Sequence, residues 1–306
     1  MRAAPAAFSL YAFALLACFA TTVPQRLPLG HVQAIDDLAY GVRVARDSLY
    51  DEVQQTTIHN AYGLAVPIYD QLRSFGVRSL ELDLHRGKLL TEGVSGDWFV
   101  YHFNLPGLND SVCNRLSDCL DGLTKFHRDA SDHGPLTIFL DLKDEFGDLY
   151  APSDLDALLL AHLDRSAIVS PKDLREACPK ATTLRDAVRG ECRWPSIDAL
   201  AAKTIFVLTG GDLCKDSPLT QYLAAPGERM AFVGPNLSED CPFSESRERA
   251  GSVVFYNLEF DRRAAVPEVH AAGLLTRIYG LDDAERWDEA SRTGAQFLAT
   301  DWLRWP

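Results

Sequence analysis

The sequence of 306 residues has few of the features that mark several common classes of protein. Lysine and arginine (30) are outnumbered by aspartate and glutamate (43), which gives a formal net charge of −13. A nucleic-acid-binding protein needs a basic face, so we expect no nucleic-acid partner. Charge alone would not hold the chain on an anionic membrane either. Beyond the N-terminus the sequence has no apolar run of membrane-spanning length, no internal repeat and no Gly/Ser linker.

Closely spaced CxxC pairs, which are typical of zinc sites, are also missing. The chain has seven cysteines, and Cys18 lies in the apolar N-terminal segment. The other six are an even number, which suits disulfides in an oxidising compartment. Six cysteines allow fifteen pairings. Pairing of nearest neighbours predicts Cys113–Cys119, Cys178–Cys192 and Cys214–Cys241.

The N-terminal segment has the pattern of an export signal. Arg2 is its only charge, and an apolar run from Phe8 to Phe19 is short for a membrane span. We therefore predict a signal peptide over residues 1–20, a leader over 21–48 and a single domain over 49–306 in a secreted, extracellular protein. Two alternatives stay open. Leu15-Leu16-Ala17-Cys18 resembles a bacterial lipobox, which would make the protein lipid-anchored through Cys18, and the segment could remain as an uncleaved anchor.

Short apolar runs alternate with helix-like stretches along the rest of the chain. This alternation predicts an α/β protein with a parallel sheet covered by helices. No glycine-rich dinucleotide fingerprint follows the first strand, and about eight βα units fit a single (β/α)8 TIM-type barrel, regular or distorted. The expected strands are Thr56–Asn60, Arg78–Leu84, Phe99–Phe103, Leu136–Lys143, Thr204–Leu208, Met230–Val233, Ser252–Phe255, Leu274–Ile278 and Gln296–Ala299. The expected helices are Pro67–Phe75, Ser117–Ala130, Ser153–Leu163, Ile197–Ala201 and Ala284–Thr293.

Polar residues follow the carboxyl ends of the early strands, where a barrel carries its functional site. Glu81 and Asp83 are two residues apart and therefore share one face of a strand. Two carboxylates so close repel each other unless a cation lies between them, and a hard divalent ion such as Ca²⁺ is the usual solution. Asn60 adds a neutral oxygen ligand, and the expected strand Leu136–Lys143 presents Asp141 and Lys143, again two residues apart on one face.

Two histidines flank this predicted cation site. His59 ends the first strand and His102 ends the third. One imidazole can take a proton from an attacking hydroxyl while the other gives one to a leaving oxygen, and the cation stabilises charge on phosphorus. This arrangement suits phosphodiester chemistry. Arg277 and Tyr279 share a face of a late strand, where they could contact a substrate phosphate or, as an equally weighted alternative, be used in a salt bridge, and Asp301 near the last strand could line the pocket.

The sequence resembles the calcium-dependent phosphatidylinositol-specific phospholipase C family. The segment from Thr57 to Tyr62 is similar to the family's THNSY motif, although Ala61 stands where the family usually has serine. The resemblance continues in order through Gln71 to Asp83, His102, Pro135 to Lys143, and Gln296 to Trp302. It covers about residues 50–302 and extends to no separate lipid-binding domain or EF-hand.

This resemblance implies a PLC-like barrel with specific roles for these residues. His59 and His102 would be the acid–base pair, and Lys143 would contact the substrate phosphate. Calcium would be bound by Asn60, Glu81 and Asp83 and by a further acidic ligand on the next inward strand. The candidate for that ligand is Asp141, with Asp144 as the alternative if the strand phase differs. The expected reaction is attack by the inositol 2-hydroxyl on phosphorus, which yields diacylglycerol and a cyclic inositol phosphate. A phospholipid substrate implies transient contact with a membrane surface, and we expect a monomer.

Two other functions remain open at this point. The enzyme could cleave glycerophosphodiesters or another phospholipid head group. His85-Arg86-Gly87 imitates the HRG motif of glycerophosphodiester phosphodiesterases, but it follows the Glu-x-Asp pair, whereas that family has it before the pair. Alternatively, the barrel could be a catalytically inactive lipid-binding protein. The full set of two histidines and their carboxylates favours an enzyme.

Overall fold

The structure is a computed structural model that describes residues 38–39, 42–43, 45–88, 91–92, 96–103, 105 and 110–303. The predicted signal peptide with Cys18 lies outside the described residues, and so does most of the predicted leader. Two short strands of that leader are described, β1 (Leu38–Ala39) and β2 (Val42–Arg43), and they pair antiparallel.

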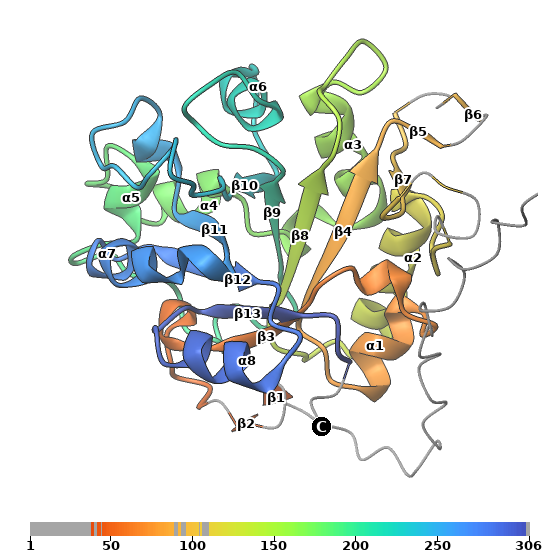
Figure 1. Cartoon of the computed structure of the whole chain (residues 1–306), viewed down its shortest axis with the longest axis horizontal. Coiled ribbons are helices and arrows are strands. Elements are labelled where there is room, and N and C mark those ends of the chain that lie inside the picture. Colours follow the sequence, from red (N-terminus) through yellow and green to blue (C-terminus); the bar gives the residue numbers. More distant parts are fainter. Residues whose placement is uncertain are drawn as a thin grey trace, which may run out of the picture. The chain divides into compact units, whose positions relative to one another are not determined.

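The described part of the domain is built on eight parallel strands with helices packed outside them (Figure 1). Their order is β10-β9-β8-β4-β3-β13-β12-β11. The barrel nearly closes, because β10 and β11 are joined by an isolated parallel bridge between Asn236 and Asn257. The fold is thus a (β/α)8 TIM-type barrel, as the sequence predicts. The strands are β3 (Gln55–Ile58), β4 (Ser79–His85), β8 (Leu136–Leu142), β9 (Thr204–Thr209), β10 (Ala231–Val233), β11 (Phe255–Glu259), β12 (Leu275–Tyr279) and β13 (Phe297–Thr300).

Three sequence-based element assignments need correction. The expected strand at Phe99–Phe103 is the short β7 (Phe99–Val100), which pairs antiparallel with β4 outside the barrel order. The strand expected at Ser252–Phe255 begins only at Phe255, because residues 250–252 form a 3-10 turn. Ile197–Ala201 forms turns and not a helix. That segment has only five residues and contains an aspartate, and so short a stretch lacks the hydrogen bonds that sustain a helix.

The remaining predicted helices lie within two residues of their expected ends. Some helices are too short for their periodicity to stand out in the sequence. The α-helices are α1 (Ile68–Ser74), α2 (Leu116–Asp129), α3 (Pro152–His162), α4 (Pro171–Glu176), α5 (Leu184–Ala187), α6 (Pro218–Ala224), α7 (Val266–Ala271) and α8 (Ala284–Ser291). A further two-stranded ribbon is formed by β5 (Gly87–Lys88) and β6 (Thr91–Glu92).

Aromatic side chains fill the barrel below the functional site. Tyr50 precedes the first barrel strand, and its ring lies 4.9 Å from Trp194 and 6.1 Å from Phe297. Phe139 and Phe255 also pack on Phe297, at 5.3 and 6.1 Å. Because side chains on a strand alternate, the residues two positions beyond Phe139 on β8 and Phe255 on β11 also face inward, nearer the carboxyl ends. These residues are Asp141 and Asn257, so polar side chains lie above the aromatic ones.

Disulfides pin the loops around this core. The described cysteines form Cys113–Cys119, Cys178–Cys192 and Cys214–Cys241, which confirms the nearest-neighbour pairing. Among the described residues, no helix has the length and apolar character that crossing a membrane requires.

Candidate active site

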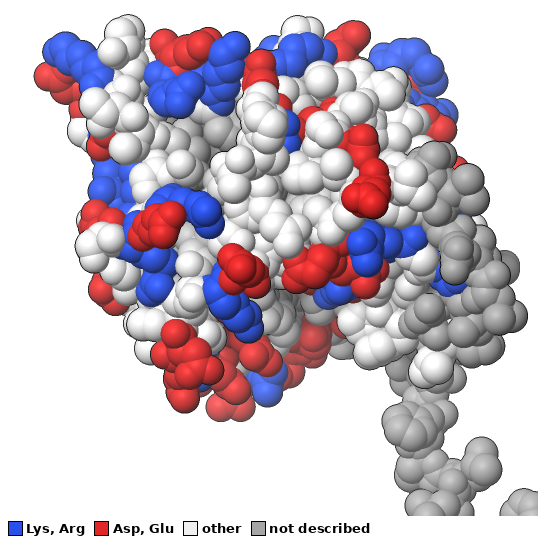
Figure 2. Space-filling model, turned by 90° about the horizontal axis from the view of Figure 1, so that it is seen from above, with Lys and Arg blue, Asp and Glu red and all other residues white. Residues whose placement is uncertain are grey.

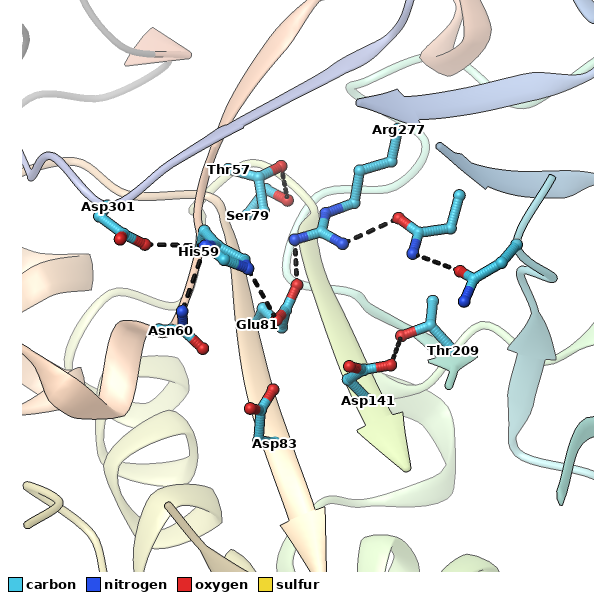
Figure 3. Close-up of polar contacts among 12 residues, drawn as sticks. Thr57, His59, Asn60, Ser79, Glu81, Asp83, Asp141, Thr209, Arg277 and Asp301 are labelled. Carbon is cyan, nitrogen blue, oxygen red and sulfur yellow. Dashed lines mark hydrogen bonds and ion pairs between the residues drawn. The ribbon is translucent and has the colours of Figure 1, made fainter. Parts of the chain in front are cut away.

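His59 stands just past the end of β3 and is held by carboxylates on both sides (Figure 3). Its Nδ1 lies 2.8 Å from Oδ1 of Asp301, which follows β13. Its Nε2 lies 3.5 Å from Oε1 of Glu81 on β4. Burial by itself lowers the pKa of His59, but the charges of Glu81 and Asp301 outweigh it, and the net shift is upward. The Tyr279 ring is stacked 6.0 Å away. Asp301 therefore holds Nδ1 of His59, and Nε2 faces Glu81.

His102 has a matching arrangement beyond β7. Its Nδ1 lies 3.1 Å from Oδ2 of Asp83, a residue with no exposed surface. The His102 side chain is 42% exposed, and its ring packs edge-on against Phe103 at 4.0 Å. A proton on Nδ1 that is donated to the carboxylate leaves Nε2 as the exchangeable position. Both predicted histidines thus contact an aspartate through Nδ1, and His102 lies nearer to solvent.

Three carboxylates gather between the histidines. Glu81, Asp83 and Asp141 each offer an oxygen within 4.8 Å of the others. Asp83 and Asp141 are register partners on β4 and β8, which explains why residues so far apart in sequence meet here. Asp144, the alternative to Asp141, instead accepts a hydrogen bond from the backbone of Arg86. Strand phase therefore places Asp141 in the group and Asp144 outside it.

Cationic side chains balance this group of carboxylates. Arg277 on β12 is 2% exposed and forms an ion pair with Glu81, and its other nitrogen donates to Asn257 at 2.9 Å. Lys143 forms ion pairs with Asp141 and, at 3.3 Å, with Asp83. Burial lowers the pKa of the Lys143 ammonium, but Asp141 and Asp83 outweigh it and hold that pKa well above its usual range. The cluster is thus partly neutralised by the chain's own residues.

Asn60, which follows His59, has a left-handed backbone conformation. Its φ is 51°, in the left-handed region that asparagine tolerates better than most residues. The buried Tyr62 donates a 2.7 Å hydrogen bond to Oδ1 of Asn60. One lone pair of that amide oxygen remains for a ligand. The sequence Asn-Ala-Tyr therefore builds a fixed neutral oxygen next to the carboxylates.

These residues suit calcium, a hard cation that takes six to eight oxygen ligands. Oδ1 of Asp83 is buried and has no hydrogen-bond partner, whereas Oδ2 of the same residue has a hydrogen bond with His102 and an ion pair with Lys143. An unpartnered buried carboxylate oxygen is costly unless something positive meets it. With the oxygens of Asn60, Glu81 and Asp141 around it, the donor set consists of oxygen atoms, as calcium requires.

Sequence reasoning missed several residues that support this site. Thr209 donates to Oδ1 of Asp141 at 2.8 Å. Asn257 links Arg277 to Asn236 across the gap between β10 and β11. None of these lies in a motif, and their only signal is a polar side chain at the end of an apolar strand.

The molecule's surface around these strand ends carries both signs of charge. Figure 2 looks down on the carboxyl ends of β4 and β8 and shows acidic and basic side chains interspersed among broad uncharged areas. Neither sign dominates this face. The fold and the site together define a class of protein, a TIM-type barrel with two histidines beside a group of three carboxylates that could hold a cation.

Comparison with known proteins specifies this class further. Residues 107–305 match the family described as Phosphoinositide phospholipase C, Ca2+-dependent. The chain therefore belongs to this family, its cofactor is calcium, and it is a phospholipase C-type phosphodiesterase. The match begins after His102, so it does not cover Asn60, Glu81, Asp83 or either histidine. No curated protein matches the chain.

Solved structures show the same fold. A calcium-dependent phosphoinositol-specific phospholipase C from Pseudomonas sp is 24% identical with a TM-score of 0.73, and the alignment covers 87% of this chain and 94% of that one. A Ca²⁺-dependent phosphatidylinositol-specific phospholipase C from Streptomyces antibioticus is 23% identical with a TM-score of 0.69, over 84% and 95% of the two chains.

Proposed function

We propose that this enzyme cleaves the phosphodiester of phosphatidylinositol by acid–base catalysis between His59 and His102, with a cyclic inositol phosphate as product. The observation that carries the proposal is the pair of histidine–aspartate contacts, His59–Asp301 and His102–Asp83, at a group of three carboxylates that includes Asp83. Each aspartate fixes the tautomer and orientation of its imidazole, and this is what a general base and a general acid need.

The two histidines have different surroundings, and these assign their roles. His59 lies deeper, and Glu81 and Asp301 raise its pKa despite the opposing effect of burial, which suits a general base, so its Nε2 would take the proton of the inositol 2-hydroxyl. As that oxygen bonds to phosphorus, the bond from phosphorus to the diacylglycerol oxygen breaks. His102, which is more exposed, would give its proton to that leaving oxygen.

The cation-binding residues in this proposal are Asn60, Glu81, Asp83 and Asp141. Bound calcium would lower the pKa of the attacking hydroxyl and offset charge on the phosphate oxygens. Lys143 would meet the substrate phosphate, and Tyr279, stacked on His59, would meet the inositol ring. Arg277 is buried against Glu81, so we assign it to holding that carboxylate in place, instead of the direct substrate contact suggested by its sequence position.

Exposed apolar side chains next to both histidines support transient contact with a membrane surface. Phe103 is 55% exposed and touches His102, and Trp302 is 46% exposed and follows Asp301 in the chain. Aromatic side chains in such positions favour the membrane interface. Secretion is part of the same proposal, because disulfides persist in oxidising compartments.

The decisive experiment is cleavage of phosphatidylinositol by the protein, with calcium and then with EGTA. We expect calcium-dependent release of cyclic inositol phosphate, and a loss of about 10²–10⁴-fold in turnover for His59→Ala and for His102→Ala. His270→Ala, on the exposed side of α7, is the matched control and should keep full activity. Unchanged turnover in both active-site variants would refute the assignment. In a parallel assay with deacylated glycerophosphoinositol, release of glycerol 3-phosphate and free inositol would instead identify a glycerophosphodiester phosphodiesterase.

The membrane contact has its own test. Phe103→Ser and Trp302→Ser should weaken binding to phosphatidylinositol-containing vesicles while leaving cleavage of a water-soluble analogue unchanged. Leu160→Ser, which removes a comparably exposed apolar side chain from α3, should not weaken vesicle binding. Equal binding by all three variants would argue against this surface.

A further inference from the structure

Lys143 occupies the position against the carboxylates that a cation would take. Its ammonium contacts Oδ2 of Asp141 and lies 3.3 Å from Oδ2 of Asp83. Both carboxylates belong to the group proposed to bind calcium. Asp83 has no exposed surface, whereas the Lys143 side chain is 32% exposed. The lysine therefore reaches from the solvent side into a buried acidic centre.

An ammonium ion and a calcium ion do not share these oxygens comfortably. Calcium binds its ligands at about 2.3–2.6 Å. A calcium ion at that distance from Asp83 and Asp141 would lie within a few ångströms of the Lys143 ammonium. Two positive ions that close in a partly buried site repel each other strongly. One of them has to leave.

The lysine can move and the carboxylates cannot. The backbone N–H of Lys143 is fixed to Leu84 at 3.0 Å, but four flexible methylenes carry the ammonium. Asp141 is held through its other oxygen by Thr209, and Asp83 is held by His102. Arg277, the other cation of the site, is buried and bonded on both sides. Displacement of Lys143 would thus leave the ligand oxygens in place.

We propose that Lys143 is an internal counter-ion that calcium displaces, and that the freed ammonium then binds the substrate phosphate. This inference rests on the proposed calcium site. It makes the binding of calcium and of an anionic substrate cooperative, because each one favours the same displaced position of Lys143. Such a coupling is reciprocal, so a phosphate ligand should raise calcium affinity by the factor by which calcium raises phosphate affinity.

Calcium titration calorimetry on the full chain tests the first half of the proposal. Lys143→Gln removes the competing charge, so we expect its calcium affinity to rise by about tenfold or more over that of the unsubstituted protein. Lys215→Gln makes the same change of charge on a side chain that is 76% exposed, and should leave the affinity unchanged. An unchanged or lower calcium affinity in Lys143→Gln overturns the inference while the calcium site stands. Absence of calcium binding in the unsubstituted protein refutes the site itself, and the inference with it.

A second measurement uses the unsubstituted protein, so it does not depend on whether a variant folds. Calcium titrations of the unsubstituted protein with and without inositol 1-phosphate should show affinity several-fold higher with the phosphate present. The same sugar without phosphate, myo-inositol, is the matched control and should give a smaller effect. Equal calcium affinity with inositol 1-phosphate and with myo-inositol overturns the coupling. Where Lys143→Gln folds, its coupling should be smaller than that of the unsubstituted protein.

Discussion

The buried ion pair between Arg277 and Glu81 gives the sharpest prediction about stability. Both side chains are almost inaccessible, at 2% and 3% exposure. Arg277→Met keeps much of the side-chain volume but removes the arginine partner of the Glu81 carboxylate, which then retains only its 3.5 Å contact with Nε2 of His59. Removal of one member of a buried pair costs about 3–5 kcal/mol, because the remaining charge is uncompensated in a medium that solvates it poorly. The hydrogen bond to Asn257 is lost as well.

That cost should be visible as a shift in the melting temperature. For a domain of this size, 1 kcal/mol corresponds to about 2 °C, so we expect the melting point in EGTA to fall by roughly 6–10 °C. Calcium should recover part of the loss, because it offers Glu81 a new positive partner. Differential scanning calorimetry of Arg277→Met with EGTA and with calcium measures both effects.

A matched surface variant separates burial from charge. Arg193 pairs with Glu52 at 2.8 Å, but the two side chains are 53% and 50% exposed. Arg193→Met should leave the melting temperature nearly unchanged, because exposed pairs contribute little. The double variant Arg277→Met with Glu81→Gln should recover stability relative to Arg277→Met alone. A melting temperature for Arg277→Met in EGTA within about 1 °C of the unsubstituted protein would refute the reasoning, since it contradicts the cost of an unpaired buried charge.

Three further predictions follow from other contacts. Burial, and to a lesser extent His133 at 2.8 Å, lowers the pKa of His127 to about 4. Stability should therefore be complete above pH 6.5, and about 2 kcal/mol, allowing for screening, should be lost as the pH falls from 6.5 to 4, which a constant urea midpoint over this range would contradict. Asp301→Asn removes a charge that raises the pKa of His59, so the acidic limb of the pH profile of kcat/KM should move to lower pH. The value of kcat should also fall by about 10²–10⁴-fold. An acidic limb at the same pH would argue against His59 as the base. Replacement of Cys178 and Cys192 by serine opens a disulfide whose cysteines are 14 positions apart and should lower the free energy of unfolding by about 3 kcal/mol. Equal urea midpoints for the variant and the unsubstituted protein would exclude this value.

Local sequence determined the type and order of the elements. Leu80, Leu82 and Leu84 alternate with Glu81 and Asp83, and this period of two specifies a strand with one polar face. β4 spans Ser79–His85, close to the expected bounds. Ile197–Ala201 was predicted wrongly, because hydrophobic spacing over five residues does not distinguish a helix from turns that pack an apolar side chain. Cysteine pairing was also local, since each bond joins neighbours along the chain.

Only the tertiary structure decided which polar residues meet. Asp141 and Asp144 are equivalent in the sequence, and the register of β8 on β4 placed Asp141 beside Asp83. His59 and Asp301 are separated by 242 positions, yet β3 and β13 are neighbours in the closed barrel. Lys143 could be expected from its motif, but its position against two carboxylates could not. A sequence specifies which face of a strand a side chain occupies, whereas the distance between residues on different strands depends on register and on barrel closure.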